Sequence, residues 1–286
     1  MNHTKFVLGT ANLGSSYGIN NSEQFDQGQS RSVLSHAIRR GINTFDTATE
    51  YGSAEELIGA TVSSDANPRI VTKIPSRDSY TFEYVSKCLD FSLSKLKQNK
   101  IYGLMFHDPD VHKKNEIQDI SKRLLDSGKI EHLGFSAYNL NTLLDAKQTN
   151  PSWTIFQVPE NILDQRLTNS SELVEMARAK NIFHVRSIFL QGLLVSKPTE
   201  IPAKFRNYEQ IFRNLHLAAV SLGINTVDLC ISYASSISWS SGIIVAAAST
   251  SQLDEILDFK FLGTDFHQFE TLPGHILDPR RWNELK

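Results

Sequence analysis

The sequence predicts an α/β fold: a single-domain (β/α)8 TIM barrel with its active site at the carboxyl ends of the strands. Eight short apolar runs alternate with eight amphipathic runs. Each parallel strand pair needs a crossover, so this order favours a parallel sheet that closes on itself under a layer of helices. No Gly-, Pro- or Ser-rich linker divides residues 1–286, and we expect 261–286 to form a C-terminal tail near the barrel mouth. An open, doubly wound sheet is the alternative.

The expected strands are runs of four to seven residues in which apolar side chains dominate. Strands of a parallel sheet are buried on both faces, so they are apolar almost throughout rather than alternating. The eight runs are residues 6–10, 42–45, 69–73, 101–106, 130–136, 153–158, 182–187 and 242–246.

The expected helices show apolar residues at helical spacing, as at Val85, Leu89, Leu93 and Leu96. Glycine ends three of them, at positions 41, 128 and 223. A Ser-x-x-Glu capping box at Ser53 is expected to open the second helix and fix the loop before it. The eight helices are residues 31–40, 54–62, 82–96, 116–126, 140–146, 171–179, 208–221 and 252–258.

Composition and charge narrow the class of protein. With 286 residues, 40% of them hydrophobic, the chain can bury a large core. A net charge of -2, with scattered Lys and Arg, gives no basic surface for nucleic acid or anionic membrane. The two cysteines cannot form a disulfide framework, and no apolar run approaches the roughly 20 residues of a membrane span. We therefore expect a cytoplasmic protein; its oligomeric state stays open.

In such a barrel the chemistry lies on the loops that follow the strands. The second strand is followed by Asp46 and Tyr51, the third ends in Lys73 and the fourth is followed by His107. A phenol has a pKa of about 10, and a nearby ammonium favours the phenolate and lowers it. The carboxylate can hold the ammonium, while the imidazole can hydrogen-bond a substrate oxygen. These residue types predict a site that protonates an oxygen.

These residues also carry a resemblance. The segments FDTATEYGSAEELIG, VTK and LMFHDPD resemble the strand-two, strand-three and strand-four motifs of the aldo-keto reductase family. The resemblance implies that Tyr51 is the general acid, that Lys73 lowers its pKa and that Asp46 holds Lys73. It implies that His107 orients the carbonyl group of a small-molecule substrate. A reduced nicotinamide would supply the hydride.

The resemblance extends to cofactor contacts. In GFSAYN the family's Asn is Ala137, and in RSIFLQGLL its aromatic is Arg186, whose guanidinium plane can stack on a nicotinamide ring. In VAAASTSQLDEIL, Ser249 and Gln252 form a capping box that opens a helix suited to a phosphate. NADP(H) is favoured, and NAD(H) stays open because no Lys or Arg lies between Arg213 and Lys260. The implied cofactor-binding residues are Gly9, Thr10, Ser136, Gln157, Arg186, Ser187, Phe189, Gly192, Ser249, Gln252 and Glu255.

Several of these residues also have purely structural explanations. Lys73 alone would be interpreted as a lysine facing solvent, and Arg186 could pair with Glu160 or Asp164. The run His107-Asp108-x-Asp110-x-His112 could be mistaken for a metal cluster. The later strand ends supply Ser, Gln, Arg and Ala rather than further ligands, so we expect no metal.

Three functions remain to be compared. The first is an NAD(P)H-dependent reductase of aldehydes, ketones or sugars. The second is a barrel enzyme that uses Lys73 as a Schiff-base nucleophile. The third is a nicotinamide-binding redox sensor with negligible turnover, which would not need the acid set.

The substrate pocket is expected to form from segments outside the strands. These are residues 15–25, 75–81, 190–207 and 261–282, with Tyr17, Phe25, Tyr80, Phe189 and Trp282 as candidate aromatic walls. We expect side chains, among them Met1 and Phe6, to plug the bottom of the barrel.

Overall fold

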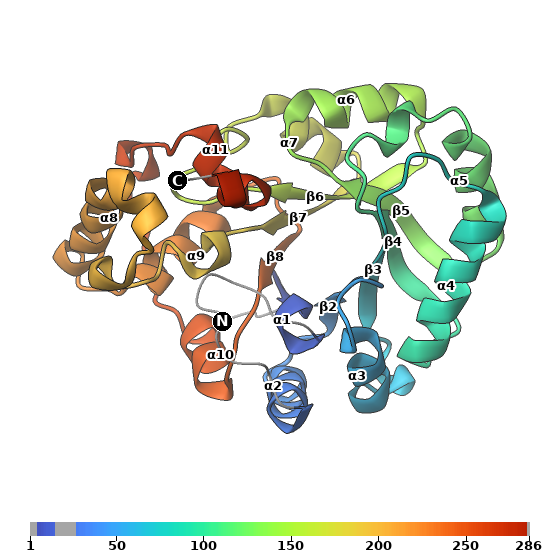
Figure 1. Cartoon of the computed structure of the whole chain (residues 1–286), viewed down its shortest axis with the longest axis horizontal. Coiled ribbons are helices and arrows are strands. Elements are labelled where there is room, and N and C mark those ends of the chain that lie inside the picture. The colour runs from blue at the N-terminus through green and yellow to red at the C-terminus, as the bar shows by residue number, and fades with distance from the viewer. Residues whose placement is uncertain (1–4, 15–26, 285–286) are drawn as a thin grey trace.

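In the computed structural model, eight parallel strands close into a barrel in sequence order, β1 to β8, which confirms the predicted fold class. The structure describes residues 5–14 and 27–284. The helices lie around the outside of the sheet (Figure 1). All eight strand boundaries agree with the expected ones to within two residues. The strands are β1 Phe6–Gly9, β2 Thr44–Asp46, β3 Arg69–Ile74, β4 Ile101–Phe106, β5 Ile130–Ser136, β6 Trp153–Pro159, β7 Ile182–Arg186 and β8 Gly242–Val245.

The helices confirm the eight expected ones to within four residues and add three. The helices are α1 Ala11–Gly14, α2 Gln27–Arg39, α3 Ala54–Thr61, α4 Phe82–Leu96, α5 Ile117–Asp126, α6 Leu140–Thr149, α7 Ser171–Arg178, α8 Glu209–Ser221, α9 Thr226–Ser236, α10 Thr250–Leu257 and α11 Gly274–Leu277. Among the described residues, no single helix could cross a bilayer; α8 with its preceding turn and α9, bent by 91°, reach the required length and composition only as a pair.

Helix α9 was not expected because its sequence lacks a polar face. Eight of its eleven residues are buried, among them Cys230 and Tyr233, so the apolar side chains show no helical stripe. The signal that could have found it lies at its start. Asn225 accepts a hydrogen bond from the amide of Asp228, whose carboxylate accepts one from the amide of Asn225.

The predicted capping box at Ser53 is wrong. The Ser53 side chain makes no capping hydrogen bond, and Glu56 pairs with Lys95 on α4 instead. Glu55 faces inward, where it accepts a hydrogen bond of 2.6 Å from the hydroxyl of Thr72. Contacts with neighbouring elements therefore override the local pattern.

The second predicted capping box is correct in part. The Ser249 hydroxyl accepts a hydrogen bond from the Gln252 amide at 3.2 Å. The Gln252 side chain, however, accepts from the amide of Ala248, one residue before the cap. The start of α10 is therefore held by both side chains.

The lower part of the barrel is filled from within the strands. Val71, Met105 and Ile155 form a small apolar cluster there, separate from the large core between sheet and helices. A Cβ at Gly242 would lie 2.8 Å from both Val7 and His184, so these two side chains also point inward.

Phe6 is not part of this filling, which corrects the expectation of a Phe6 plug. Its ring packs edge-on against Phe259, which follows α10 on the outside of the sheet. Side chains alternate along a strand, so Phe6 faces the helices because Val7 faces the interior. Met1 lies outside the described residues.

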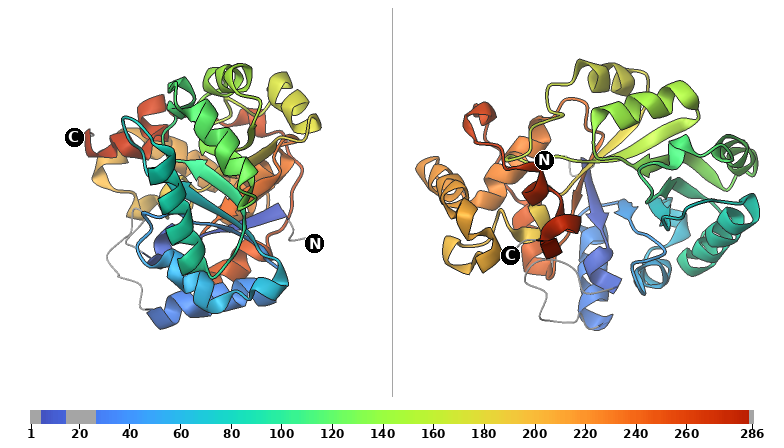
Figure 2. Two further views of the ribbon diagram at one scale, coloured as in Figure 1. Left: turned by 90° about the vertical axis from the view of Figure 1, so that its right-hand side faces the viewer. Right: turned by 45° about the horizontal axis from the view of Figure 1, so that its top comes forward.

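The C-terminal segment returns to the barrel and packs on the turn before α8. The views of Figures 1 and 2 place α11 beside α8 and α9. Trp282 is buried with its ring centre 4.9 Å from that of Phe205. The amide of Leu272 donates to the carbonyl oxygen of Leu163. These contacts carry residues 279 and 280 to the carboxyl end of the barrel, where they line the cavity described next.

Candidate active site

A buried ion pair between β2 and β3 forms the base of the site. The Lys73 side chain is 1% exposed, and its ammonium donates to both oxygens of Asp46, at 2.7 and 2.8 Å. It donates also to the carbonyl oxygen of Thr47 at 2.8 Å. A buried charge must be paired and hydrogen-bonded, and these three acceptors meet that need. The alternative of a solvent-facing lysine is therefore wrong.

Tyr51 stands above this pair on the loop between β2 and α3. The Lys73 nitrogen lies 5.2 Å from the centre of the Tyr51 ring. The loop is fixed at Gly52, whose φ is +56° and whose hypothetical Cβ would lie 2.1 Å from the carbonyl oxygen of Gly14. Only glycine fits both the backbone conformation and this close approach. The loop thus holds the phenol rigidly without the expected cap at Ser53.

The pKa of Tyr51 departs from the expected direction. Burial raises the pKa of the phenol, and the carboxylate of Asp46 raises it further. The charge of Arg186 acts in the opposite direction and lowers it. The prediction that Lys73 lowers this pKa overlooked Asp46, which neutralises the ammonium where it stands. In this state Tyr51 is a protonated hydroxyl at neutral pH.

His107 follows β4 and faces Tyr51. The centres of the two rings are 6.0 Å apart, at 48°. The Nδ1 of His107 lies 2.8 Å from a carboxylate oxygen of Glu50. Burial lowers the pKa of His107, and the charge of Lys73 lowers it further, while Glu50 raises it. A carboxylate can only accept, so the neutral ring keeps its proton on Nδ1 and leaves Nε2 as an acceptor.

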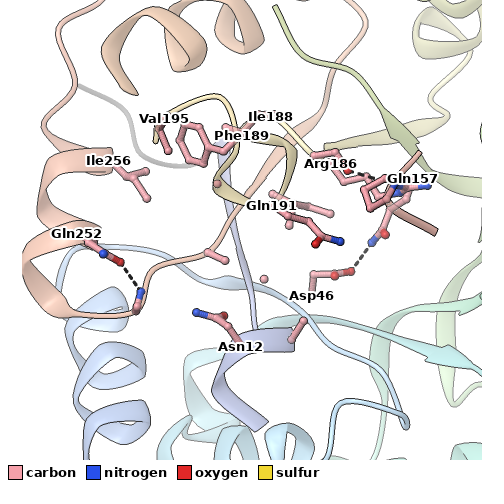
Figure 3. A pocket seen from close by; sticks show the side chains of 18 of the residues that line it. Asn12, Asp46, Gln157, Arg186, Ile188, Phe189, Gln191, Val195, Gln252 and Ile256 are labelled. Atoms are coloured by element: carbon pink, nitrogen blue, oxygen red, sulfur yellow. Dashed lines mark hydrogen bonds between the residues drawn. The ribbon is translucent and has the colours of Figure 1, made fainter. Parts of the chain in front are cut away.

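Gln157 and Ser136 occupy the ends of the neighbouring strands β6 and β5, where they are paired in register. The Gln157 side-chain nitrogen donates to Asp46, as the dashed line in Figure 3 marks. Its amide oxygen and the Ser136 hydroxyl remain for a ligand, because both residues line the cavity. An acceptor beside a hydroxyl suits a carboxamide group.

The segment after β7 forms a strained wall. Ser187, Leu190 and Gln191 have φ values of +63°, +46° and +56°, an uncommon cluster of left-handed residues that is typical of functional sites. Gly192 follows with a φ of +94°. Ser187, Phe189, Gln191 and Gly192 all line the cavity.

Arg186, at the end of β7, does not pair as the structural alternative expected. Asp164 is taken by Arg166 at 2.6 Å, and Glu160 accepts from the hydroxyls of Thr168 and Tyr233. The guanidinium carbon of Arg186 lies instead 4.5 Å from the centre of the Tyr138 ring.

The opposite end of the cavity is the start of α10. Gln252 and Glu255 line it, and Asn12 and Gln29 hold the preceding loop by donating to the carbonyl oxygens of residues 247 and 248, each at 2.9 Å. The first amides of a helix have no partner within the helix, so this end suits an anionic group. Figure 3 shows Gln252 facing across the cavity from Arg186 and Gln157.

One cavity of about 930 Å³ connects these parts. Its volume lies at the upper end of the roughly 300–1,000 Å³ typical of small-molecule sites. Its two polar ends are the Gln157–Ser136 pair and the start of α10. Thr10 and Ser249, expected in the cofactor set, do not line it. The Thr10 hydroxyl donates to the carbonyl oxygen of Asp46, and the Ser249 hydroxyl accepts from the amide of Gln252. The expected residues that do line it are Gly9, Asp46, Tyr51, Lys73, His107, Ser136, Gln157, Arg186, Ser187, Phe189, Gly192, Gln252 and Glu255.

The expected substrate-pocket segments contribute unequally. Val195, Ser196 and Glu200 line the cavity from the segment after β7. Tyr80 and Trp282 do not, since each is buried against other rings. Residues 15–25, with Tyr17 and Phe25, lie outside the described residues. The sequence alone did not indicate Tyr138 and Arg280 as wall residues, or Glu50 as the partner of His107. The available signal for Glu50 is that it directly precedes Tyr51.

Of the residues from His107 to His112, only His107 lines the cavity. The Asp108 carboxylate accepts a hydrogen bond from the backbone amide of Asp110, as in a turn. The His112 ring stacks on the Phe135 ring. Within residues 5–14 and 27–284, no group of three His, Cys, Asp or Glu side chains is placed to hold a metal ion.

Comparison with known proteins shows which family this chain is similar to. A model of the aldo/keto reductase family matches residues 5–271. Aldo-keto reductase YhdN of Bacillus subtilis (strain 168) is 24% identical over 221 residues, 71% of this chain and 66% of the relative's length. Aldo-keto reductase AMT2 of Alternaria alternata is 26% identical over 294 residues, 83% of this chain and 79% of the relative.

Solved structures share the fold at lower identity. The glycerol dehydrogenase AKR11B4 of Gluconobacter oxydans superposes with a TM-score of 0.68 at 18% identity, over 98% of this chain and 90% of that one. A putative aldo-keto reductase from Pseudomonas aeruginosa gives 0.66 at 18% identity, over 89% and 88%. At this identity the likeness is one of fold.

Proposed function

The chain belongs to the aldo/keto reductase family, whose members are NAD(P)H-dependent oxidoreductases, and we propose that it reduces the carbonyl group of a small molecule. One observation carries the proposal. The hydroxyl-bearing ring of Tyr51 lies between the buried Lys73–Asp46 pair and the imidazole of His107, on the wall of a cavity of about 930 Å³.

Proton transfer from Tyr51 completes the reaction. When bound, the reduced nicotinamide supplies the hydride that adds to the carbonyl carbon. The carbonyl oxygen then takes the proton of the Tyr51 hydroxyl, and an alcohol leaves. Burial favours the neutral phenol, so the acid is present in its protonated form at neutral pH. The charge of Arg186 favours the phenolate left behind, since it lowers the pKa of the Tyr51 phenol.

His107 has two roles that depend on its protonation. The protonated ring donates from Nε2 and can orient a carbonyl oxygen, as the family resemblance implies. The neutral ring, with its proton shared with Glu50, accepts at Nε2 and suits the hydroxyl of an alcohol. The same side chain therefore serves both directions of the reaction.

The cofactor would be held by the two polar ends of the cavity. Ser136 and Gln157 would bind the carboxamide, and the start of α10 would receive a phosphate. The family resemblance favours NADP(H). NAD(H) is the second cofactor we propose, because the described cationic residues that line the cavity are Lys73, Arg186 and Arg280, while α10 contributes the carboxylate of Glu255. Titration of cofactor fluorescence with NADPH and NADH measures the preference directly.

The alternative of Lys73 as a Schiff-base nucleophile has little support. An amine must lose its proton to attack a carbonyl, and three acceptors hold this ammonium charged. Borohydride trapping of a substrate on Lys73 would revive the alternative. A cytoplasmic location suits the free thiols of Cys88 and Cys230.

The decisive test is Tyr51→Phe, assayed by NAD(P)H oxidation with a panel of aldehydes, ketones and sugars. Loss of the general acid should lower kcat by about 10²–10⁴-fold. Tyr84→Phe is the matched control, since Tyr84 lies on α4 beside Arg77 and away from the cavity. Rates of Tyr51→Phe within a few-fold of wild type would refute the role of the phenol. A single burst of cofactor oxidation without turnover would favour the redox sensor.

A further inference from the structure

Two arginines from distant parts of the chain meet over one tyrosine on the cavity wall. The guanidinium carbon of Arg186 lies 4.5 Å from the centre of the Tyr138 ring, and that of Arg280 lies 3.7 Å from it. Both arginines line the cavity that holds Tyr51. Planar guanidinium groups pack on aromatic rings and leave their N–H edges free to bind an anion. Tyr138 thus carries two guanidinium groups at the cavity wall.

The charges on this wall do not cancel. Asp278 binds Arg280 through two hydrogen bonds, of 2.8 and 2.7 Å. Arg186 has no such partner: in the described part of the chain no carboxylate forms an ion pair with it, and its Nη1 donates only to the Ser187 hydroxyl at 3.3 Å. Two guanidinium charges therefore stand against one carboxylate charge, and that carboxylate is bound to Arg280.

Arg186 also carries an unused donor. No described acceptor bonds to its Nη2, although that nitrogen is buried. A buried polar group without a partner costs free energy, and a charged one costs more. An anionic group that reached this nitrogen would supply the missing acceptor and the missing charge together.

The position of Arg186 relative to the reacting hydroxyl sets where the anion lies in the substrate. Arg186 and Tyr51 line the same cavity, and the charge of Arg186 lowers the pKa of the Tyr51 phenol. The other cation near Tyr51, Lys73, is already held by Asp46. An anion bound at Arg186 would therefore belong to the same small molecule as the carbonyl group.

We infer that the substrate is a carbonyl compound that also carries a carboxylate or a phosphate, which binds to the guanidinium edges of Arg186 and Arg280. This inference rests on the proposed reductase function and names its substrate class. It assigns the N–H edge of Arg186 to the substrate, while the Tyr138 ring packs on one face of the guanidinium group. Glu200 and Glu255 also line the cavity; Glu200 pairs with Lys197 and Glu255 accepts from Asn225.

The test compares kcat/KM for 4-carboxybenzaldehyde and for 4-formylbenzamide, which has the same shape without the charge. We expect the wild type to favour the acid at least about tenfold, as charge-assisted hydrogen bonds permit. In Arg186→Gln this ratio should fall by roughly tenfold or more, chiefly through KM. Arg186→Lys keeps the charge but not the fork, and should recover part of the ratio. A ratio unchanged in Arg186→Gln overturns the inference.

Two further comparisons complete the design. Arg166→Gln is the matched control, because Arg166 pairs with Asp164 and does not line the cavity; its ratio should equal that of the wild type. Glyceraldehyde 3-phosphate and glyceraldehyde form a second substrate pair. The pair with the larger wild-type ratio tells whether carboxylate or phosphate is the preferred anion.

A binding measurement separates this inference from the reductase proposal. Calorimetry would compare 4-(hydroxymethyl)benzoate with its amide on the enzyme with oxidised cofactor. Tighter binding of the acid, lost in Arg186→Gln, supports the anion site whatever the turnover. Equal binding of acid and amide overturns the site, while reduction of neutral aldehydes would leave the reductase proposal intact.

Discussion

The two walls of the cavity differ in how their charges are balanced. On the β2–β4 wall, Lys73 is matched by Asp46, and the imidazole of His107 is matched by Glu50. On the wall formed by β7 and the C-terminal tail, no carboxylate of the described residues forms an ion pair with Arg186, and its Nη2 has no acceptor among them. The first wall is a finished network that can hold a phenol in place for proton transfer. The second wall carries a guanidinium group whose Nη2 could bind an anion, and we therefore assign this wall to substrate recognition.

The two walls also differ in backbone. Glycine accommodates the tight turn beside Tyr51, since Gly52 carries the positive φ there. After β7, non-glycine residues adopt the left-handed conformation at Ser187, Leu190 and Gln191. Such strain costs about 1–2 kcal/mol per residue and persists where the surroundings enforce it. Backbone strain is thus found on the wall formed by β7 and the C-terminal tail and not on the β2–β4 wall. This difference agrees with separate roles for the two walls, substrate recognition and proton transfer.

The largest effect is expected from removing the buried ion pair between Lys73 and Asp46. Lys73→Met leaves the Asp46 carboxylate buried without its cation, and should lower the free energy of unfolding by about 3–5 kcal/mol, measured by urea denaturation. Lys113→Met breaks the exposed pair with Asp110 and should cost no more than about 1 kcal/mol. If the two variants lose similar stability, the Lys73–Asp46 pair is not the closed unit described here.

The next effect tests the rigidity of the Tyr51 loop. Gly52→Ala combines a left-handed alanine with a clash against Gly14, so it should destabilise by about 2–4 kcal/mol and lower kcat. Gly41 has a φ of +88° but nothing within 4 Å of a Cβ, so Gly41→Ala should cost only the backbone term of about 1–2 kcal/mol. Thermal or urea unfolding measures both, and equal losses would show that the contact with Gly14 is not tight.

A smaller effect concerns the pH dependence of His107. Glu50 raises the pKa of this imidazole against the lowering by burial and Lys73, so Glu50→Gln should lower it further. The protonated ring then appears only at lower pH, and the limb of the kcat/KM profile for carbonyl reduction that reports His107 should move to lower pH. A profile that stays in place or moves to higher pH would contradict the Glu50–His107 pairing.

The burial of His107 also predicts the sign of a stability change. The folded pKa of His107 lies below its unfolded value of about 6.5, so the neutral form is favoured by folding. Its contribution is fully present above the unfolded pKa and is lost as the pH falls towards the folded pKa. Unfolding curves measured between pH 7 and 5, for wild type and His107→Gln, should diverge with this sign.

The smallest effect concerns the ion pair between Asp278 and Arg280, on the wall formed by β7 and the C-terminal tail. Asp278→Asn removes the carboxylate that Arg280 now binds, which frees a second guanidinium for the substrate. The preference for 4-carboxybenzaldehyde over its amide should rise about two- to fivefold, the size expected for a partly exposed ion pair. A lower preference would show that Asp278 positions Arg280 rather than competing for it.

The sequence predicted the fold through local periodicity. Strand and helix patterns follow from spacing that is written into each segment, as at Val85, Leu89 and Leu93. Helix α9 was missed because burial on nearly all sides erases that spacing. The capping box at Ser53 was expected wrongly, because Glu55 and Glu56 find partners on β3 and α4 that no local pattern reveals.

The sequence by itself determined the closed parallel barrel and the delivery of Asp46, Tyr51, Lys73 and His107 to its carboxyl end, since those follow from the order of strands and the residues after them. The tertiary structure alone decided how their charges balance. In the folded protein the Tyr51 pKa is raised, where a lowering was expected. The fold also brings Arg280 from the tail to Tyr138, beside Arg186. The physical reason is that a charge is changed by burial and by neighbours within a few ångströms, and neither exists until the chain has folded.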